Sequence, residues 1–221
     1  MQDRSNKLLK AIVELHIKTA HPVASKILAD EQQFGVSSAT IRNDMWELEQ
    51  AGFIHQPHIS AGRVPTILGY RYYLDNLLSV SSIDHKEKQE LAIAMNKNIR
   101  DLAKLLVDKV NLAVIVNFAP HDLYFTGLFN LFSQPEFSDY KMVLSMSQVV
   151  DSLEKAMAQI FHNIDKPQVL LGRENPFNIH CAAAIAPLKT KQQQLLTILG
   201  PVRMDYNRIL ALLDEVVKIP V

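Results

Sequence analysis

Apolar residues at helical spacing open the chain. They recur at i, i+3, i+4 and i+7 and predict an amphipathic helix over residues 4–18. These positions are Leu8, Ala11, Ile12 and Leu15. Pro22 ends this helix and opens a second one, which we place over 24–32 with Ile27 and Leu28 in the core.

A third helix follows a tight turn. The turn over 34–36 contains Gly35, whose backbone is permissive, and Ser37 after it is an N-cap residue. The helix then covers 38–51 and ends at Gly52. Its predicted inner face carries Ile41, Met45 and Leu48. Its predicted outer face carries Ala39, Arg42, Asn43, Trp46, Glu47 and Gln50.

A short β-hairpin is predicted after the third helix. One strand covers 53–56, a polar loop turns the chain, and residues 63–65 return. Thr66 can cap a further helix over 67–78. This helix is rich in tyrosines, which we expect to pack in the core and at the hinge. They are Tyr70, Tyr72 and Tyr73.

The second half of the chain mixes strands and helices. The polar segment 79–85 breaks the pattern, so we expect a domain over 1–78, a linker and long helix over 79–110, and a second domain over 111–221. The long helix itself is predicted over 87–110. The predicted strands are 112–118, 123–126, 168–171, 179–186 and 195–199, and the predicted helices are 138–145, 148–163 and 203–217. Strands that are continuously apolar indicate a sheet covered on both faces, and hence an α/β or α+β second domain.

Composition and charge limit the class of protein. With 221 residues, 48% hydrophobic and 21% charged, the chain suits one large folded domain or two small ones. The formal net charge is +0, so any DNA-binding surface must come from the arrangement of cations. The single cysteine, Cys181, is expected to be a buried packing residue rather than a reactive thiol. No secretory leader and no apolar run of roughly 18–20 residues is recognisable, so we expect a cytoplasmic protein without membrane contact.

The third helix is the predicted reader of DNA. The order helix, tight turn, helix, β-hairpin is that of a winged helix-turn-helix, which places one helix in a major groove about 12 Å wide. Small hydroxyl residues at the start of this helix can approach phosphates closely, and they are Ser37, Ser38 and Thr40. Arg42 can pair with O6 and N7 of guanine, and Asn43 with N6 and N7 of adenine. A helix start that is only capped and solvated has the same residues, so that alternative stays open.

The hairpin loop places further polar groups beside this helix. His58, Ser60 and Arg63 are predicted to contact the DNA backbone or the minor groove. His55 and His58 lack the further ligands of a zinc site, so we expect no metal. Trp46 on the outer face of the helix either packs against the loop or touches the sugar-phosphate surface.

Short motifs run along almost the whole chain and are densest in residues 1–78. In the first half they are TAHPVASK at 19–26, SSATIRNDM at 37–45, LE at 48–49, QPH at 56–58, SAGR at 60–63, PT at 65–66 and GYRYY at 69–73. In the second half they are PEF at 135–137, LGREN at 171–175 and GPVRMDY at 200–206. By these motifs the chain resembles the HrcA family of heat-inducible transcription repressors.

The resemblance implies a homodimer that binds an inverted-repeat operator in double-stranded DNA and represses heat-shock chaperone genes. It implies an α+β fold class, with an N-terminal winged helix-turn-helix domain and a C-terminal GAF-like α/β domain for dimerisation and regulation. It also implies modulation by the GroE chaperonin. The interval 112–172 is shorter than the one that holds an inserted dimerisation segment in longer members, so the chain resembles a short form of the family.

Two other functions compete with this interpretation. An enzyme would need a nucleophile, a base and an orienting group at a productive spacing. His180 and Cys181 would point to opposite faces of a strand, so we expect no enzyme and no cofactor. The remaining alternative is a winged-helix regulator that responds to a small molecule bound in the second domain. No clear ligand motif supports it, since the polar run 173–175 is predicted to form a turn.

Overall fold

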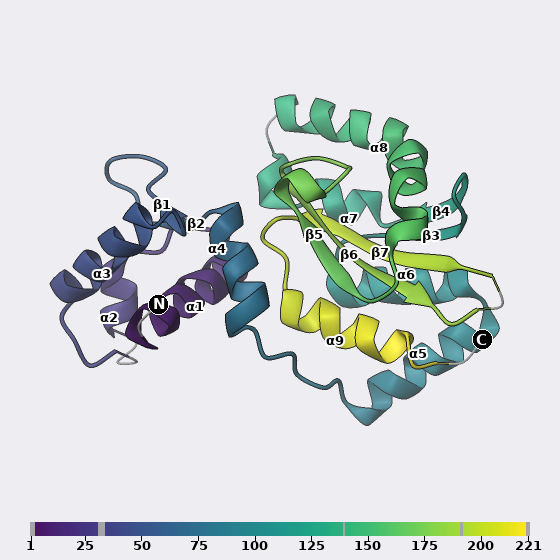
Figure 1. The fold of residues 1–221 in the computed structure, drawn as a ribbon, viewed down its shortest axis with the longest axis horizontal. Helices are drawn as coiled ribbons and strands as arrows, with labels where there is room; N and C mark the ends of the chain where they lie inside the picture. The colour runs from purple at the N-terminus through teal and green to yellow at the C-terminus, as the bar shows by residue number, and fades with distance from the viewer. Residues whose placement is uncertain (1–2, 31–33, 139, 191, 220–221) are drawn as a thin grey trace. The chain divides into compact units, whose positions relative to one another are not determined.

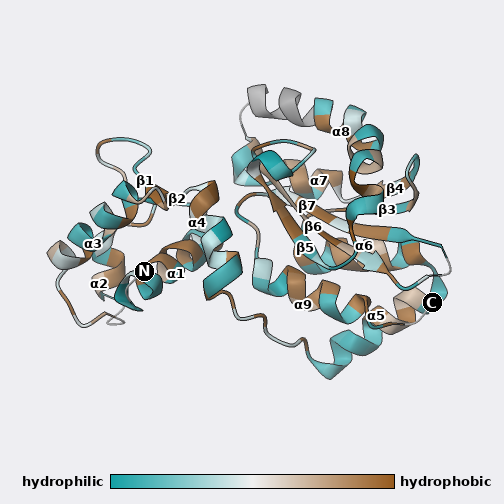
Figure 2. Ribbon diagram, in the orientation of Figure 1, coloured by the Kyte–Doolittle hydropathy of each residue, from teal (hydrophilic) through white to brown (hydrophobic). Residues whose placement is uncertain are grey.

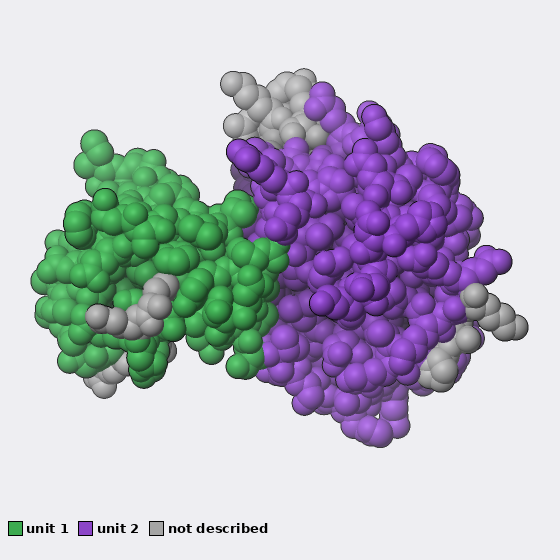
Figure 3. Space-filling model, viewed as in Figure 1, with its two compact units in different colours: residues 1–79 green, residues 80–221 purple. Residues whose placement is uncertain are grey.

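The chain folds around two separate cores. The computed structural model describes residues 3–30, 34–138, 140–190 and 192–219, with the backbone alone for 140–147. It divides into a first unit over 1–79 and a second over 80–221 (Figure 3). The division lies within the polar segment where we placed the domain boundary. Residues 80–110, which we expected to form a linker and a long helix, belong to the second unit.

The first unit has the order of elements predicted for a winged helix. Its elements are α1 (Asp3–Thr19), α2 (Ser25–Asp30), α3 (Ser38–Gln50), β1 (Ile54–His55), β2 (Val64–Pro65), α4 (Ile67–Tyr72) and a π-helical turn (Tyr73–Leu77) (Figure 1). The two strands pair antiparallel, with Ile54 opposite Pro65. Leu8, Ile12 and Leu28 are fully buried in the core beneath them.

One buried position in this unit was predicted wrongly. Ile27 is 45% exposed, while Leu28 beside it is fully buried. The reason is the shortness of α2, whose two turns bury one stripe, formed by Ser25 and Leu28 at spacing i, i+3. The predicted end of this helix, at 31–32, lies outside the described residues.

The tyrosines of α4 and the π-helical turn join them to α1. Tyr70 and Tyr73 are buried, and their packing role is confirmed. The Tyr70 hydroxyl lies 2.7 Å from Nδ1 of His16, and the Tyr72 hydroxyl donates to Oδ1 of Asn6 at 3.1 Å. These hydrogen bonds attach the segment predicted as a helix over 67–78 to α1. The last part of this segment is a π-helical turn rather than an α-helix.

The second unit is a sheet between two layers of helices. Its elements are α5 (His85–Lys97), α6 (Ile99–Val110), β3 (Ala113–Ala119), β4 (Asp122–Thr126), α7 (Leu128–Phe132), α8 (Tyr140–Ile160), β5 (Gln168–Leu171), β6 (Cys181–Leu188), β7 (Gln194–Pro201) and α9 (Tyr206–Val216). The strands pair antiparallel in the order β4-β3-β7-β6-β5. Helices α7 and α8 cover one face, and α5, α6 and α9 lie on the other side (Figure 1). The expected α+β class, with a sheet covered by helices, is confirmed. Strands β6 and β7 are hydrophobic along most of their length (Figure 2), as the prediction of a covered sheet requires.

Several predicted elements of the second unit differ from the structure. The helix predicted over 87–110 is two helices, because Asn98 has extended backbone and its side chain caps α6 by accepting from the backbone N–H of Arg100 at 2.8 Å. The two helices predicted over 138–163 are the single helix α8 followed by a 3₁₀ turn, and the short α7 was not predicted. Strand β6 begins at Cys181 rather than 179, so His180 lies outside it. Among the described residues, no helix combines the length and apolar character needed to cross a lipid bilayer.

Cys181 is a packing residue, as expected. Its side chain is fully buried in the core between the sheet and α8. Burial raises the pKa of its thiol to about 12, so almost none of it is the reactive thiolate at neutral pH.

An ion-pair network joins α5, α6 and α9. Glu87 accepts from both terminal nitrogens of Arg208, one at 2.7 Å, and its Oε1 lies 3.3 Å from Nζ of Lys109. The hydrogen bonds from Arg208, with help from Lys109, lower the pKa of Glu87 to about 2. Glu87 therefore stays ionised in the folded protein at pH values where the unfolded chain takes up a proton.

We expect Glu87 to make the second unit sensitive to acid. A carboxyl whose folded pKa is lowered stabilises the fold above its unfolded pKa, near 4.5, and loses that effect as the pH falls toward 2. At neutral pH, Glu87→Gln should cost about 1–2 kcal/mol, because solvent screens part of the interaction. Urea unfolding followed by circular dichroism between pH 7 and about pH 3 measures this. The gap between wild type and variant should shrink as the pH falls, and a constant gap would contradict the assignment.

Candidate nucleic-acid interface

The outer face of α3 is open to solvent along its length. Ser37 caps the helix by accepting from the backbone N–H of Thr40 at 3.2 Å, as predicted, and the two hydroxyl oxygens lie 3.0 Å apart. The predicted inner residues Ile41, Met45 and Leu48 are buried. The predicted outer residues Ala39, Arg42, Asn43, Trp46, Glu47 and Gln50 are all exposed. The helical phase read from the sequence is therefore correct.

Arg42 and Asn43 are adjacent on this face, and their side chains are accessible to a ligand in solution. Neither side chain has a hydrogen-bond or ion-pair partner among the described residues, and both are exposed. Trp46 is 58% exposed and makes no ring contact in the described part of the chain. Of the two roles considered for Trp46, this exposure favours the one at the outer surface of the helix.

Asp44 is a structural residue that sequence reasoning missed. It is buried between α1 and α3, where its Oδ1 accepts from Nη2 of Arg4 at 2.8 Å. The pair links α3 to α1. The available signal was its place at i+3 from Ile41, on the inner stripe of the helix.

The wing, which we define as residues 54–65, is held to α3 by one carboxylate. Glu49 accepts from the backbone N–H of Gln56 at 2.8 Å through Oε1 and from Nε of Arg63 at 2.9 Å through Oε2. The Gln56 side chain in turn donates to the backbone carbonyls of Ile59 and Ala61, each at 2.9 Å. These bonds order the loop from its base to its tip. Sequence reasoning assigned no role to either Glu49 or Gln56.

The wing is also joined to the start of α2. Val23 and Arg63 exchange two backbone hydrogen bonds of 2.8 Å. This close approach requires glycine at position 62, because a Cβ there would lie 2.3 Å from the carbonyl oxygen of Val23. The wing, α2 and α3 therefore form one framework.

The predicted contact residues of the loop differ in accessibility. His58 and Ser60 are exposed, and Ile59 between them, which we did not single out, is 99% exposed at the tip. Arg63 points inward instead, with a side chain only 16% exposed against Glu49. Its ion pair makes it a positioning group for the wing. In the described part of the chain, no three His, Cys, Asp or Glu side chains lie close enough to hold a metal ion.

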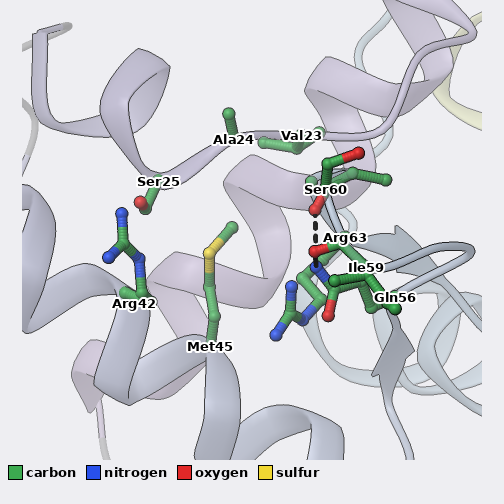
Figure 4. A pocket seen from close by; sticks show the side chains of 11 residues that line it. Val23, Ala24, Ser25, Arg42, Met45, Gln56, Ile59, Ser60 and Arg63 are labelled. Atoms are coloured by element: carbon green, nitrogen blue, oxygen red, sulfur yellow. Dashed lines mark hydrogen bonds between the residues drawn. The ribbon is translucent and has the colours of Figure 1, made fainter.

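A hollow of about 360 Å³ lies between the wing, α2 and α3 (Figure 4). Residues 23–25 form one wall, Arg42 and Met45 of α3 a second, and Gln56 and 59–63 of the wing a third. The Arg42 side chain extends along α3 toward Ser25, and Ser60 lies across the hollow (Figure 4). Lys and Arg in residues 1–79 are equal in number to Asp and Glu, so the local arrangement decides where an anion can bind.

This first unit is a winged helix-turn-helix module, joined to an α+β second unit. Residues 29–64 match the DeoR-like helix-turn-helix domain family, and residues 73–210 match the family described as HrcA protein C terminal domain. Because the second match covers more than half of the chain, the chain belongs to the HrcA family. The family is one of transcription regulators rather than enzymes.

Similar proteins of known name cover part of the chain. It is 41% identical over 124 residues to the heat-inducible transcription repressor HrcA of Symbiobacterium thermophilum, a match to 53% of this chain and 36% of the relative. It is 52% identical over 97 residues to the protein of that name from Synechocystis sp., covering 43% and 26%. The chain thus spans about a third or less of the length of these relatives. A crystal structure of a protein described as hypothetical has the same fold, with a TM-score of 0.79 and 19% identity over 99% of this chain and 98% of that one.

Proposed function

We propose that this protein is a sequence-specific transcriptional repressor of heat-shock chaperone genes that binds an inverted-repeat operator. The observation that carries the proposal is the outer face of α3, where Arg42 and Asn43 are exposed and unpaired beside a wing that Glu49 holds to the same helix. A helix in this setting can enter a major groove while the wing reaches the adjacent backbone or minor groove. The names of the relatives support the same function.

Each candidate residue has a role that fits its position. Asn43 reads adenine, since its amide can pair with N6 and N7 at once. Arg42 contributes a cation on the same face. The hydroxyls at the start of α3 contact phosphates, and they belong to Ser37, Ser38 and Thr40. On the wing, His58 and Ser60 contact the DNA backbone or minor groove, and Arg63 positions the loop that carries them.

A homodimer follows from the energetics of recognition. One module offers one or two bidentate side chains, each worth about 1–3 kcal/mol of discrimination. Recognition of one site in a genome takes about 4–10 kcal/mol. Two copies on a two-fold axis, each reading a half-site, close this gap, and we assign dimerisation and regulation to the second unit.

Footprinting tests this function directly. The purified chain is added to the promoter regions of the chaperone genes of its own genome. We expect protection of two half-sites related by an inverted repeat. We also expect two copies of the protein to bind each operator. In the cytoplasm we expect GroE chaperonin to modulate the repressor. Adding GroE to the footprinting reaction should therefore change the fraction of operator that is protected. A protein that binds these promoters no better than random duplex at moderate salt would end the proposal.

A second candidate function is a regulator that binds a small polar molecule in the second unit. Two polar side chains favour it, because Asn117 and Thr197 are fully buried with no hydrogen-bond partner among the described residues. Ile115 pairs with Thr197 and Asn117 with Leu195, so both side chains lie on the sheet face that packs against α8. Buried unpaired polar groups cost about 1–3 kcal/mol each, which a ligand could recover. A rise in melting temperature with a metabolite alone supports this candidate, and loss of that rise in Asn117→Leu is the control.

A further inference from the structure

The geometry of double-stranded DNA determines what must pass between α3 and the wing. The major and minor grooves are separated by the phosphodiester backbone of one strand. If α3 occupies the major groove and the wing the adjacent minor groove, as the proposed function requires, that strand crosses the space between them. In this protein that space is the hollow described above.

We propose that the hollow seats one phosphodiester group of each half-site and that Arg42 binds this phosphate rather than a base edge. The inference rests on the proposed function but assigns Arg42 a different partner from guanine. Arg42, Ser25 and Ser60 come from the three walls, and all three carry groups that donate hydrogen bonds to phosphate oxygens. Figure 4 shows Arg42 directed along the hollow toward Ser25, with Ser60 on the opposite wall.

The charges around the hollow match a single phosphate. Two arginines line it, but the charge of Arg63 is compensated by Glu49, with Nε and Oε2 2.9 Å apart. Arg42 has no ion-pair partner in the described part of the chain, so one positive charge is left for one negative phosphate. A planar guanidinium binds two phosphate oxygens in a fork, which strengthens and orients the contact.

The shape of the hollow permits a close approach of the DNA backbone. Small residues form part of its lining, namely Ala24, Ala61 and Gly62, beside the larger side chains of Val23, Met45, Gln56 and Ile59. The wing keeps its position beside the start of α2, because Gly62 packs directly against the backbone of Val23 and two backbone hydrogen bonds join Val23 and Arg63. The width of the hollow is fixed by this contact. Asn43, the next residue of α3, does not line the hollow and remains available to a base.

Neutral phosphates on the operator test the proposal. Methylphosphonate replaces one phosphate at a time across a half-site, and the affinity of each duplex is measured by fluorescence anisotropy. For the wild type we expect replacement of the phosphate that is seated in the hollow to weaken binding about tenfold. For Arg42→Ala the same replacement should change little, since the partner is already absent, whereas Asn43→Ala should remain as sensitive as wild type.

The behaviour on unrelated DNA separates this inference from the proposed function. Arg42→Ala should lose affinity equally for operator and for random duplex, with the slope of log K against log salt reduced by about one per subunit. Arg42→Lys keeps the charge without the two-pronged contact, so it should restore the salt slope but only part of the affinity. Arg173→Ala, which removes an exposed arginine of the second unit, should leave the slope unchanged. If Arg42→Ala loses preference for the operator but stays sensitive to every methylphosphonate, Arg42 reads a base and the inference is wrong. A wild type without preference for the operator overturns the proposed function itself.

Discussion

Replacing Gly62 by alanine should weaken operator binding severely while the second unit stays folded. The new Cβ would lie 2.3 Å from the carbonyl oxygen of Val23 and 2.4 Å from its carbonyl carbon. Both atoms belong to the backbone, so no side chain can rotate away, and the two hydrogen bonds from Val23 to Arg63 must break. Each bond contributes about 1 kcal/mol, and the orientation of the wing is lost with them. We expect the affinity for the operator to fall by about a hundredfold or more.

The control for this variant is Gly35→Ala. Gly35 has a φ of +61°, but nothing lies within 4 Å of an added Cβ, so this substitution costs only backbone strain of about 1 kcal/mol. It should leave affinity within a few-fold of wild type. Protection of the buried Cys181 thiol from a thiol reagent reports on the second unit in both variants. Wild-type affinity in Gly62→Ala would show that the wing does not need its contact with α2.

The sequence predicted those parts of the first unit that depend on local chemistry. Side-chain oxygens cap α3 and α4 within three residues of their own position, at Ser37 and Thr66, and such bonds can be read from neighbouring residues. The phase of α3 followed from its apolar spacing for the same reason. These local rules were enough to predict which side chains of α3 face outward.

The same reasoning failed where a distant residue decides the outcome. Arg63 was expected to reach DNA, but Glu49, fourteen positions earlier, turns it inward. Asp44 is buried because Arg4, at the start of α1, pairs with it. In the second unit, the capping side chain of Asn98 divides a run whose apolar spacing is continuous on both sides. The spacing of apolar residues does not show which distant side chain a charged residue will pair with, or where a polar side chain will end a helix.

Asn43→Ala should reduce specificity more than any other change at the outer face of α3. The alanine removes both of the hydrogen bonds that we propose between Asn43 and adenine, and their loss should cost about 1–3 kcal/mol for one half-site. A dimer carries the substitution twice, so the operator should lose about 2–6 kcal/mol, roughly 30- to 20,000-fold in affinity. Binding to random duplex should hardly change, since Asn43 is exposed and holds no other part of the protein.

Duplexes with one and with two half-sites distinguish reading by the helix from assembly of the dimer. Gln50→Ala removes an exposed amide from the far end of the same helix and should leave both affinities near wild type. For Asn43→Ala, the loss in free energy on the full operator should be about twice that on a single half-site, because each subunit loses its own contact. Equal losses on operator and random DNA would instead make Asn43 a backbone contact. A loss confined to the full operator would mean that α3 acts through dimer assembly, since only a contact made by each subunit separately weakens binding to an isolated half-site.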